Sequence, residues 1–268
     1  MQEISELEKK IKLEVEMKSY SGADRVVYAD DKLKEIEEER KHKPAFAAFT
    51  GWGTFDAQID GFRKGQLIVL SGPPKNGKSQ FCAAITARLW NKYKCVWFQY
   101  ELNYEEFLAR FPKNSENKLD FYLPNYMESG NLEWIEKRIV EAKEKHGIEI
   151  VFIDHLDFLR DVKDLRNVSM NLSTYVGGIV QKVKQLAIKH EVVIFLMTHI
   201  RKNEWTKDSL PNSEELRDSG QIAQLADIVL MIIRRRSKEG DEVYHPTGVL
   251  VGEMENRHNG KTKKISMT

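Results

Sequence analysis

The sequence has few cysteines, no long apolar run and almost no net charge. Its 268 residues include 2 cysteines, Cys82 and Cys95, which match no metal-ligand spacing and stand in apolar surroundings. We therefore expect reduced core thiols rather than a disulfide framework or a zinc site. No window reaches the roughly 18 apolar residues of a membrane span. These absences predict a soluble protein in a reducing compartment, the cytoplasm, or the host cytoplasm if the source is viral.

The charge balance excludes a basic field over the whole molecule. The chain has 42 Lys+Arg and 41 Asp+Glu, a net charge of +1. Any contact with nucleic acid must then come from a local patch. With 41% hydrophobic residues, the chain can bury one substantial core.

The N-terminal stretch predicts a charged helical arm. Within residues 2–18, apolar side chains recur at steps of three and four among Glu and Lys, at Ile4, Leu7, Ile11 and Val15. This is the pattern of an amphipathic helix with a narrow apolar stripe. Residues 30–43 form a second charged helical stretch that ends before a proline. We assign residues 1–43 to a linker or partner-docking arm and residues 44–268 to the core domain.

The core region alternates apolar runs with amphipathic stretches. The runs cover residues 66–71, 95–100, 148–153, 192–198 and 227–233, and the helical stretches include 79–93, 132–146 and 171–190. Such alternation is typical of a parallel sheet covered on both faces. Residues 249–255 and 262–267 instead flank an Asn-Gly hairpin signal. The predicted fold is α/β, with a mostly parallel central sheet and a C-terminal β-hairpin.

A glycine-rich segment follows the first predicted strand and opens a predicted helix. It satisfies G-x-x-x-x-G-K-[ST] and comprises Gly72, Pro73, Pro74, Lys75, Asn76, Gly77, Lys78 and Ser79, with Gln80 next. Backbone N–H groups of such a loop surround a β-phosphate, the lysine charge reaches the β and γ oxygens, and the serine holds Mg²⁺. The flanking strand and helix disfavour the alternative, a Gly-Pro turn without function. We predict ATP and Mg²⁺ as ligands.

Two carboxylates follow buried strands and are candidates for the chemistry. Asp154 ends the run 150–153, at the edge of the sheet where parallel strands place their ligands, and is the predicted Walker B acid. The next residue is His155, so the AAA+ arrangement with an adjacent glutamate is excluded. Glu101 ends the strand after the P-loop helix and is the candidate general base; the alternative is a surface carboxylate. Asp157 is either a solvated loop residue or a group that supports the residues in direct contact with the ligand.

Five segments carry a family resemblance. They are residues 52–78, Phe98-Gln-Tyr-Glu-Leu102, Ile153-Asp-His-Leu156, Met197-Thr-His199 and Leu216-Arg-Asp-Ser-Gly-Gln-Ile-Ala-Gln-Leu-Ala-Asp227. In this order they resemble the motifs of the RecA-like domain of DnaB-type replicative helicases, including the phage and Twinkle-like branch. The last segment is the most specific, because P-loop proteins at large do not need it. The resemblance covers about residues 45–268 and implies a RecA-like ATPase core.

The resemblance also implies roles for single residues. Glu101 matches the catalytic base, Asp154 the metal-binding acid, and His199 replaces the glutamine that senses the γ-phosphate. Arg217 and Gln224 match the fixed Arg and Gln of the 216–227 segment, which couple the sites. Arg234 matches an arginine that packs on the nucleotide base, although Arg234-Arg-Arg236 can equally be a surface basic run.

The remaining implications concern assembly and DNA. Arg257 matches an arginine finger given to a neighbouring subunit, and Glu255 stands where the family has a lysine. A finger in trans implies a closed ring, a homo-hexamer, whose arm packs on the adjacent subunit. Two loops match those that contact single-stranded DNA, with Arg160, Lys163, Arg166, Arg201, Lys202 and Lys207; solvated loops of mixed charge are the alternative.

Three functional classes stay open at this stage. The first is an ATP-driven helicase or translocase on single-stranded DNA, with 5′ to 3′ polarity and a primase or loader as partner by resemblance. The second is a RecA/KaiC-like ATPase without unwinding activity, and the third is a nucleotide-binding scaffold in a replication complex. The resemblance also leaves open a minimal ring helicase, a part of a longer protein and a motor that has lost unwinding.

Overall fold

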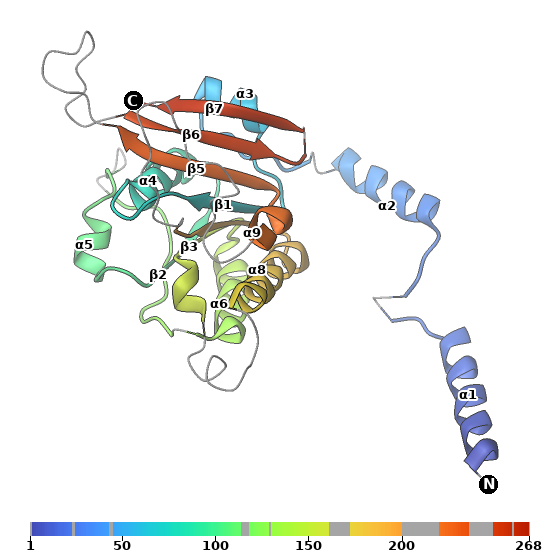
Figure 1. The fold of residues 1–268 in the computed structure, drawn as a ribbon. Helices are drawn as coiled ribbons and strands as arrows, with labels where there is room; N and C mark the ends of the chain where they lie inside the picture. The colour runs from blue at the N-terminus through green and yellow to red at the C-terminus, as the bar shows by residue number, and fades with distance from the viewer. Residues whose placement is uncertain are drawn as a thin grey trace, which may run out of the picture. The chain divides into compact units, whose positions relative to one another are not determined.

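The structure is a computed structural model that divides into two compact units, Met1–Ala45 and Phe46–Thr268 (Figure 1). It describes residues 2–22, 25–42, 45–113, 118–128, 130–160, 172–199, 220–235, 249–258 and 260–267. No helix in these ranges is both long and apolar enough to cross a bilayer.

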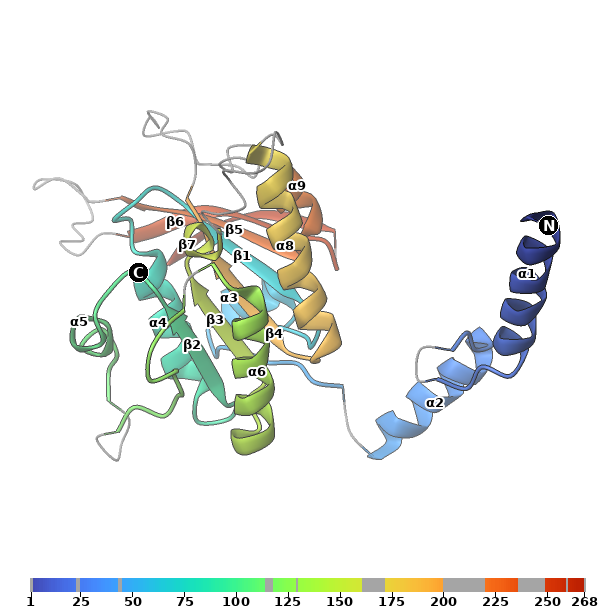
Figure 2. The ribbon, with the colours of Figure 1, turned by 90° about the horizontal axis from the view of Figure 1, so that it is seen from below.

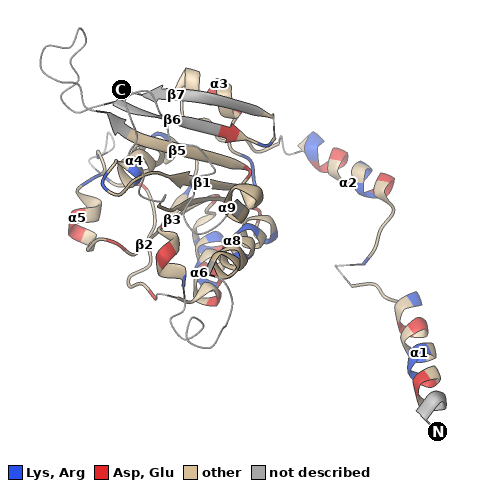
Figure 3. Cartoon of the chain, viewed as in Figure 1, with Lys and Arg blue, Asp and Glu red and all other residues tan. Residues whose placement is uncertain are grey.

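The N-terminal unit contains the two expected helices, α1 (Gln2–Lys18) and α2 (Ala29–His42). Charges of both signs are interspersed along them (Figure 3). The apolar stripe of α1 is open to solvent, since Leu7, Ile11 and Val15 are each more than half exposed, and α2 buries no residue. The unit therefore has no core of its own among the described side chains.

The second unit is built on one seven-stranded sheet in the order β2-β3-β4-β1-β5-β6-β7. The strands are β1 (Leu67–Ser71), β2 (Cys95–Gln99), β3 (Ile150–Asp154), β4 (Val193–Met197), β5 (Ile228–Arg235), β6 (Val249–Asn256) and β7 (Lys261–Met267). The first five pair in parallel, and β6 and β7 continue the sheet antiparallel. This confirms the predicted mostly parallel sheet with a C-terminal hairpin.

Helices cover both faces of the sheet (Figure 2). One face packs against α6 (Leu132–His146), α8 (Leu172–Lys189) and α9 (Gly220–Leu225), and the other against α3 (Gly53–Ile59), α4 (Lys78–Leu89) and α5 (Tyr104–Leu108). Neighbouring strand residues point to opposite faces, so Val151 joins the first cluster and Phe152 the second. Burial on both faces explains the continuous apolar runs of the sequence.

The expected core thiols lie in the second cluster. Cys82 on α4 and Cys95 on β2 are buried and free. Because β1 to β4 are parallel, their carboxyl ends meet at one edge of the sheet, and the residues that follow them form the candidate site.

Candidate nucleotide-binding site

The P-loop joins β1 to α4 with a backbone that only glycine adopts easily. Gly72 has φ +156°, and a Cβ there would lie 2.1 Å from the carbonyl oxygen of Ile232 on β5. Gly77, in the left-handed region at φ 91°, precedes the first residue of α4 and provides no side-chain cap. The first N–H groups of α4 are thus open toward the loop, which is an arrangement suited to a phosphate.

Lys78 lies inside the loop with its ammonium held by backbone oxygens. Its Nζ donates to the carbonyls of Gly72 at 2.8 Å and Pro73 at 3.0 Å, and the residue is 6% exposed. Burial lowers the pKa of Lys78 to about 8, although the charges of Asp154 and Glu101 oppose this. A phosphate would exchange these neutral acceptors for charged ones, which strengthens the contact.

Ser79 and Asp154 meet at the end of β3. The Ser79 hydroxyl donates to Asp154 Oδ2 at 2.6 Å. Burial raises the pKa of the Asp154 carboxyl to about 6, and the hydrogen bond from Ser79 opposes the rise. A hydroxyl and a buried carboxylate beside a phosphate site form the hard oxygen donor set that Mg²⁺ prefers, so the residues fit the predicted metal.

A cavity of about 550 Å³ opens in front of these groups. Its lining contains the P-loop residues Lys75, Gly77, Lys78, Ser79 and Gln80, together with Glu101, Arg110 and His199. Glu101 is exposed to the cavity just after β2, so a general base and the phosphate loop share one space. Arg110 was missed from the sequence. It follows α5 without a motif, and its carbonyl accepts from Gln80 Nε2 at 3.3 Å.

Two histidines stand side by side at the ends of β3 and β4. His199 Nδ1 is 3.0 Å from Lys78 Nζ, and the rings of His155 and His199 are 4.5 Å apart between centroids. Burial first, then Lys78, lowers the pKa of His199 to about 4. The ring is therefore neutral at pH 7, with Nδ1 accepting from the ammonium and Nε2–H left to donate. Such a donor at the cavity edge fits the expected contact with a γ-phosphate.

Arg257 lies at the opposite edge of the sheet from the P-loop. Its backbone N–H donates to the carbonyl of Asp227 at 2.9 Å, and the N–H of Asp227 donates to the carbonyl of Leu67 at 2.9 Å. Leu67 begins β1, whereas Gly72 follows its end, about 16 Å farther along the strand. The Arg257 guanidinium is exposed and donates to the carbonyl of Gln224 on α9. The geometry separates this arginine from the phosphate site of its own chain.

The structure describes only part of the expected DNA and coupling residues. The Arg160 side chain is 17% exposed and pairs with Asp157 at 2.5 Å. Gln224 is exposed on α9, beside Arg257. Arg234 lies on β5, but its side chain is outside the described part. The others predicted are also outside the described residues: Lys163, Arg166, Arg201, Lys202, Lys207 and Arg217.

The fold and the site define a class of protein, the RecA-like P-loop ATPase domain. A solved structure described as an isolated "ATPase Domain" shares the fold with a TM-score of 0.69, at 18% identity, over 90% of this chain and 95% of that one. "The Structure Of A DnaB-Like Replicative Helicase And Its Interactions With Primase" has a TM-score of 0.66, at 17% identity, over 97% of this chain and 68% of that one. At these identities, the likeness establishes the fold alone.

The sequence comparisons add the family. The model described as the DnaB-like helicase C terminal domain matches residues 113–268, more than half of the chain, and the chain belongs to this family. It is 26% identical over 252 residues to a probable replicative DNA helicase of Trieres chinensis, covering 81% of this chain and 55% of that protein. Against the replicative DNA helicase DnaB of Rickettsia conorii the identity is 26% over 224 residues, covering 69% and 44%. The chain thus spans about half the length of these relatives.

Proposed function

We propose that this chain is the motor of a ring-shaped DNA helicase, which hydrolyses Mg-ATP between neighbouring copies and moves on single-stranded DNA during replication. The proposal rests on membership of the DnaB-like family and on the phosphate, acid and sensor groups gathered around one cavity. The observation that carries it is the place of Arg257, at the edge of the sheet away from its own P-loop.

The cavity residues divide the work of hydrolysis among them. Open N–H groups of α4 and the Lys78 ammonium hold the β- and γ-phosphates, and Glu101 orients and deprotonates the attacking water. Ser79 and Asp154 would hold Mg²⁺, which neutralises charge on the phosphate oxygens. His199 donates from Nε2 to the γ-phosphate, so its position depends on whether the phosphate is present. Arg110, in the cavity lining, adds a second positive charge.

Assembly follows from the place of the arginine. An exposed guanidinium remote from its own site completes a site only in another copy, and repeated head-to-tail contacts close into a ring. A small cavity of about 270 Å³ beside Arg257 supports this face as the docking side. We propose a homo-hexamer, in which the exposed apolar stripe of α1 packs on a neighbouring copy.

DNA and protein partners are part of the same proposal. Single-stranded DNA would pass through the ring along the two loops that begin at Arg160 and after His199, held by phosphate contacts repeated in each copy. A solved relative is described with primase, and we extend that partner to this chain. The polarity we expect is 5′ to 3′.

The test combines ATP hydrolysis with strand separation. Turnover is measured with and without single-stranded DNA, and unwinding on a forked duplex, for the wild type, Lys78→Ala and Arg257→Ala. We expect hydrolysis that rises with DNA in the wild type and is lost in both variants. Hydrolysis indifferent to DNA by a monomer contradicts the helicase, and turnover indifferent to DNA by an assembled ring favours an ATPase that works without unwinding.

A further inference from the structure

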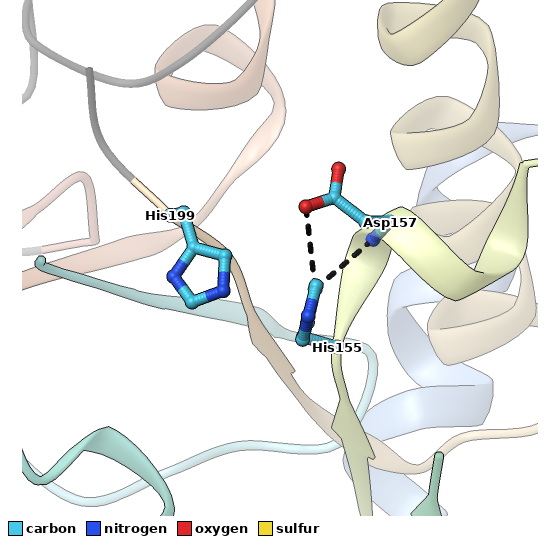
Figure 4. Close-up of side chains that lie close together, drawn as sticks. All are labelled: His155, Asp157 and His199. Atoms are coloured by element: carbon cyan, nitrogen blue, oxygen red, sulfur yellow. Dashed lines mark hydrogen bonds and ion pairs between the residues drawn. The ribbon is translucent and has the colours of Figure 1, made fainter. Parts of the chain in front are cut away.

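Three side chains beside the nucleotide cavity gather donor atoms that differ from those of the magnesium site. His155, Asp157 and His199 each offer one ligand atom, and these atoms all lie within 4.8 Å of one another. Figure 4 shows the His155 ring between the Asp157 carboxylate and the His199 ring. We propose that these three residues bind a divalent transition-metal ion of the Zn²⁺ type, separate from the Mg²⁺ held by Ser79 and Asp154.

The spacing of the first two ligands fits an ion better than a hydrogen bond. His155 Nδ1 lies 3.5 Å from Asp157 Oδ2, which is longer than the 2.7–3.2 Å of an N–H···O bond. Two ligands at about 2.1 Å from a tetrahedral zinc are about 3.4 Å apart. Only His199 must then approach, by roughly 1 Å, a distance that rotation of its side chain supplies.

The ligands are held by groups that leave their donor atoms facing one another. Arg160 binds Asp157 Oδ1 at 2.5 Å, so Oδ2 is the oxygen turned toward His155. His155 and His199 follow β3 and β4, which pair in parallel, so the sheet fixes the separation of their backbones. Ligands oriented in this way by neighbouring groups bind metal more tightly than free side chains do.

The donor set selects the kind of ion. Two imidazoles and one carboxylate suit Zn²⁺, Co²⁺ and Ni²⁺, whereas Mg²⁺ prefers oxygen ligands alone. His199 also lines the nucleotide cavity, which leaves room for water as a fourth ligand. Within the described ranges, this is the one group of three such ligands that lie this close together.

Metal binding at this place would compete with the phosphate site for His199. In the structure His199 Nδ1 contacts Lys78 Nζ at 3.0 Å, and an ion would draw the ring toward His155 and Asp157. Given the proposed function, the ion would fix the sensor away from the γ-phosphate and slow hydrolysis while ATP still binds. The Lys78 ammonium repels the ion, so the negative charge of a bound nucleotide would raise the affinity for metal.

The binding test uses metal-free full-length chain without Mg²⁺ or nucleotide. Zn²⁺ is titrated by calorimetry, and Co²⁺ is added to record the visible absorption that reports its coordination. We expect one ion per wild-type chain and an affinity at least about tenfold lower in Asp157→Asn and His155→Asn. The control is His190→Asn, since His190 pairs with Glu136 at 2.8 Å outside the cluster, and it should bind like the wild type.

Asp157→Asn keeps the size of the side chain and decides the question if His155→Asn does not fold. Thermal unfolding without metal checks that the variant is folded, and Zn²⁺ should raise the unfolding temperature of the wild type but not of Asp157→Asn. A wild type that binds no ion, or a folded Asp157→Asn that binds as tightly, overturns the proposal. Neither result depends on ATP hydrolysis, so a failed helicase assignment would leave this test intact.

Discussion

The close approach of the P-loop to β5 makes Gly72→Ala the most informative single substitution. A Cβ at Gly72 would meet the Ile232 carbonyl oxygen at 2.1 Å, whereas such contacts are essentially never shorter than 3.0 Å. Both atoms belong to backbone, so the loop and β5 must separate by about 1 Å. Overpacking of this kind costs about 1–3 kcal/mol, and the unusual φ adds about 1 kcal/mol.

A total cost of about 2–4 kcal/mol lowers the unfolding temperature of a domain of this size by roughly 4–16 °C. Thermal unfolding followed by circular dichroism measures this, and binding of a fluorescent ATP analogue reports the loop. We expect weaker nucleotide binding as well, because the displaced loop no longer directs its N–H groups inward.

Gly147→Ala is the matched control. Gly147 caps α6 at φ +66° with nothing within 4 Å of the added Cβ, so the substitution adds only the backbone strain, about 1–2 kcal/mol. Nucleotide binding should be unchanged there. If Gly72→Ala unfolds no earlier than Gly147→Ala and binds nucleotide normally, the close approach of the P-loop to β5 is wrong.

Two further predictions follow from buried charges. The pKa of Lys78 is lowered to about 8 and a phosphate raises it, so ATP binding at pH 8.5 should take up protons, seen as a dependence of the calorimetric enthalpy on the buffer; equal enthalpies in all buffers would contradict this. The Lys184 ammonium binds Asp227 Oδ2 at 2.5 Å, and the backbone of Asp227 holds that of Arg257. Lys184→Met should therefore lower the free energy of unfolding in urea by about 1–3 kcal/mol, whereas an unchanged midpoint would show the pair to be unimportant.

The sequence predicted those parts of the fold that depend on burial alone. The helix expected at residues 132–146 is α6 with the same bounds, and all five parallel strands lie where apolar runs were found. Burial on both faces makes these runs unambiguous. The short helix α5 was missed because its five residues give too little periodicity.

The candidate site was predictable where a motif fixes the spacing along the chain. The P-loop, Asp154 and Glu101 share one edge, as expected from the rule that parallel strands end together. Arg110 could not be found, because the loop after α5 brings it to the cavity and no spacing announces it. The contact of His155 with His199 depends on the neighbouring order of β3 and β4, which the sequence does not reveal.

The central claim is that each ATP site is shared by two copies of the chain, and subunit mixing tests it most directly. Arg257→Ala and Glu101→Gln are each expected to lose ATP hydrolysis, one for want of the arginine and the other for want of the base. In a 1:1 mixture, roughly one interface in four joins an intact base to an intact arginine, so about a quarter of the wild-type turnover should return. A mixture that assembles and stays inactive, or Arg257→Ala with full activity by itself, would contradict the account.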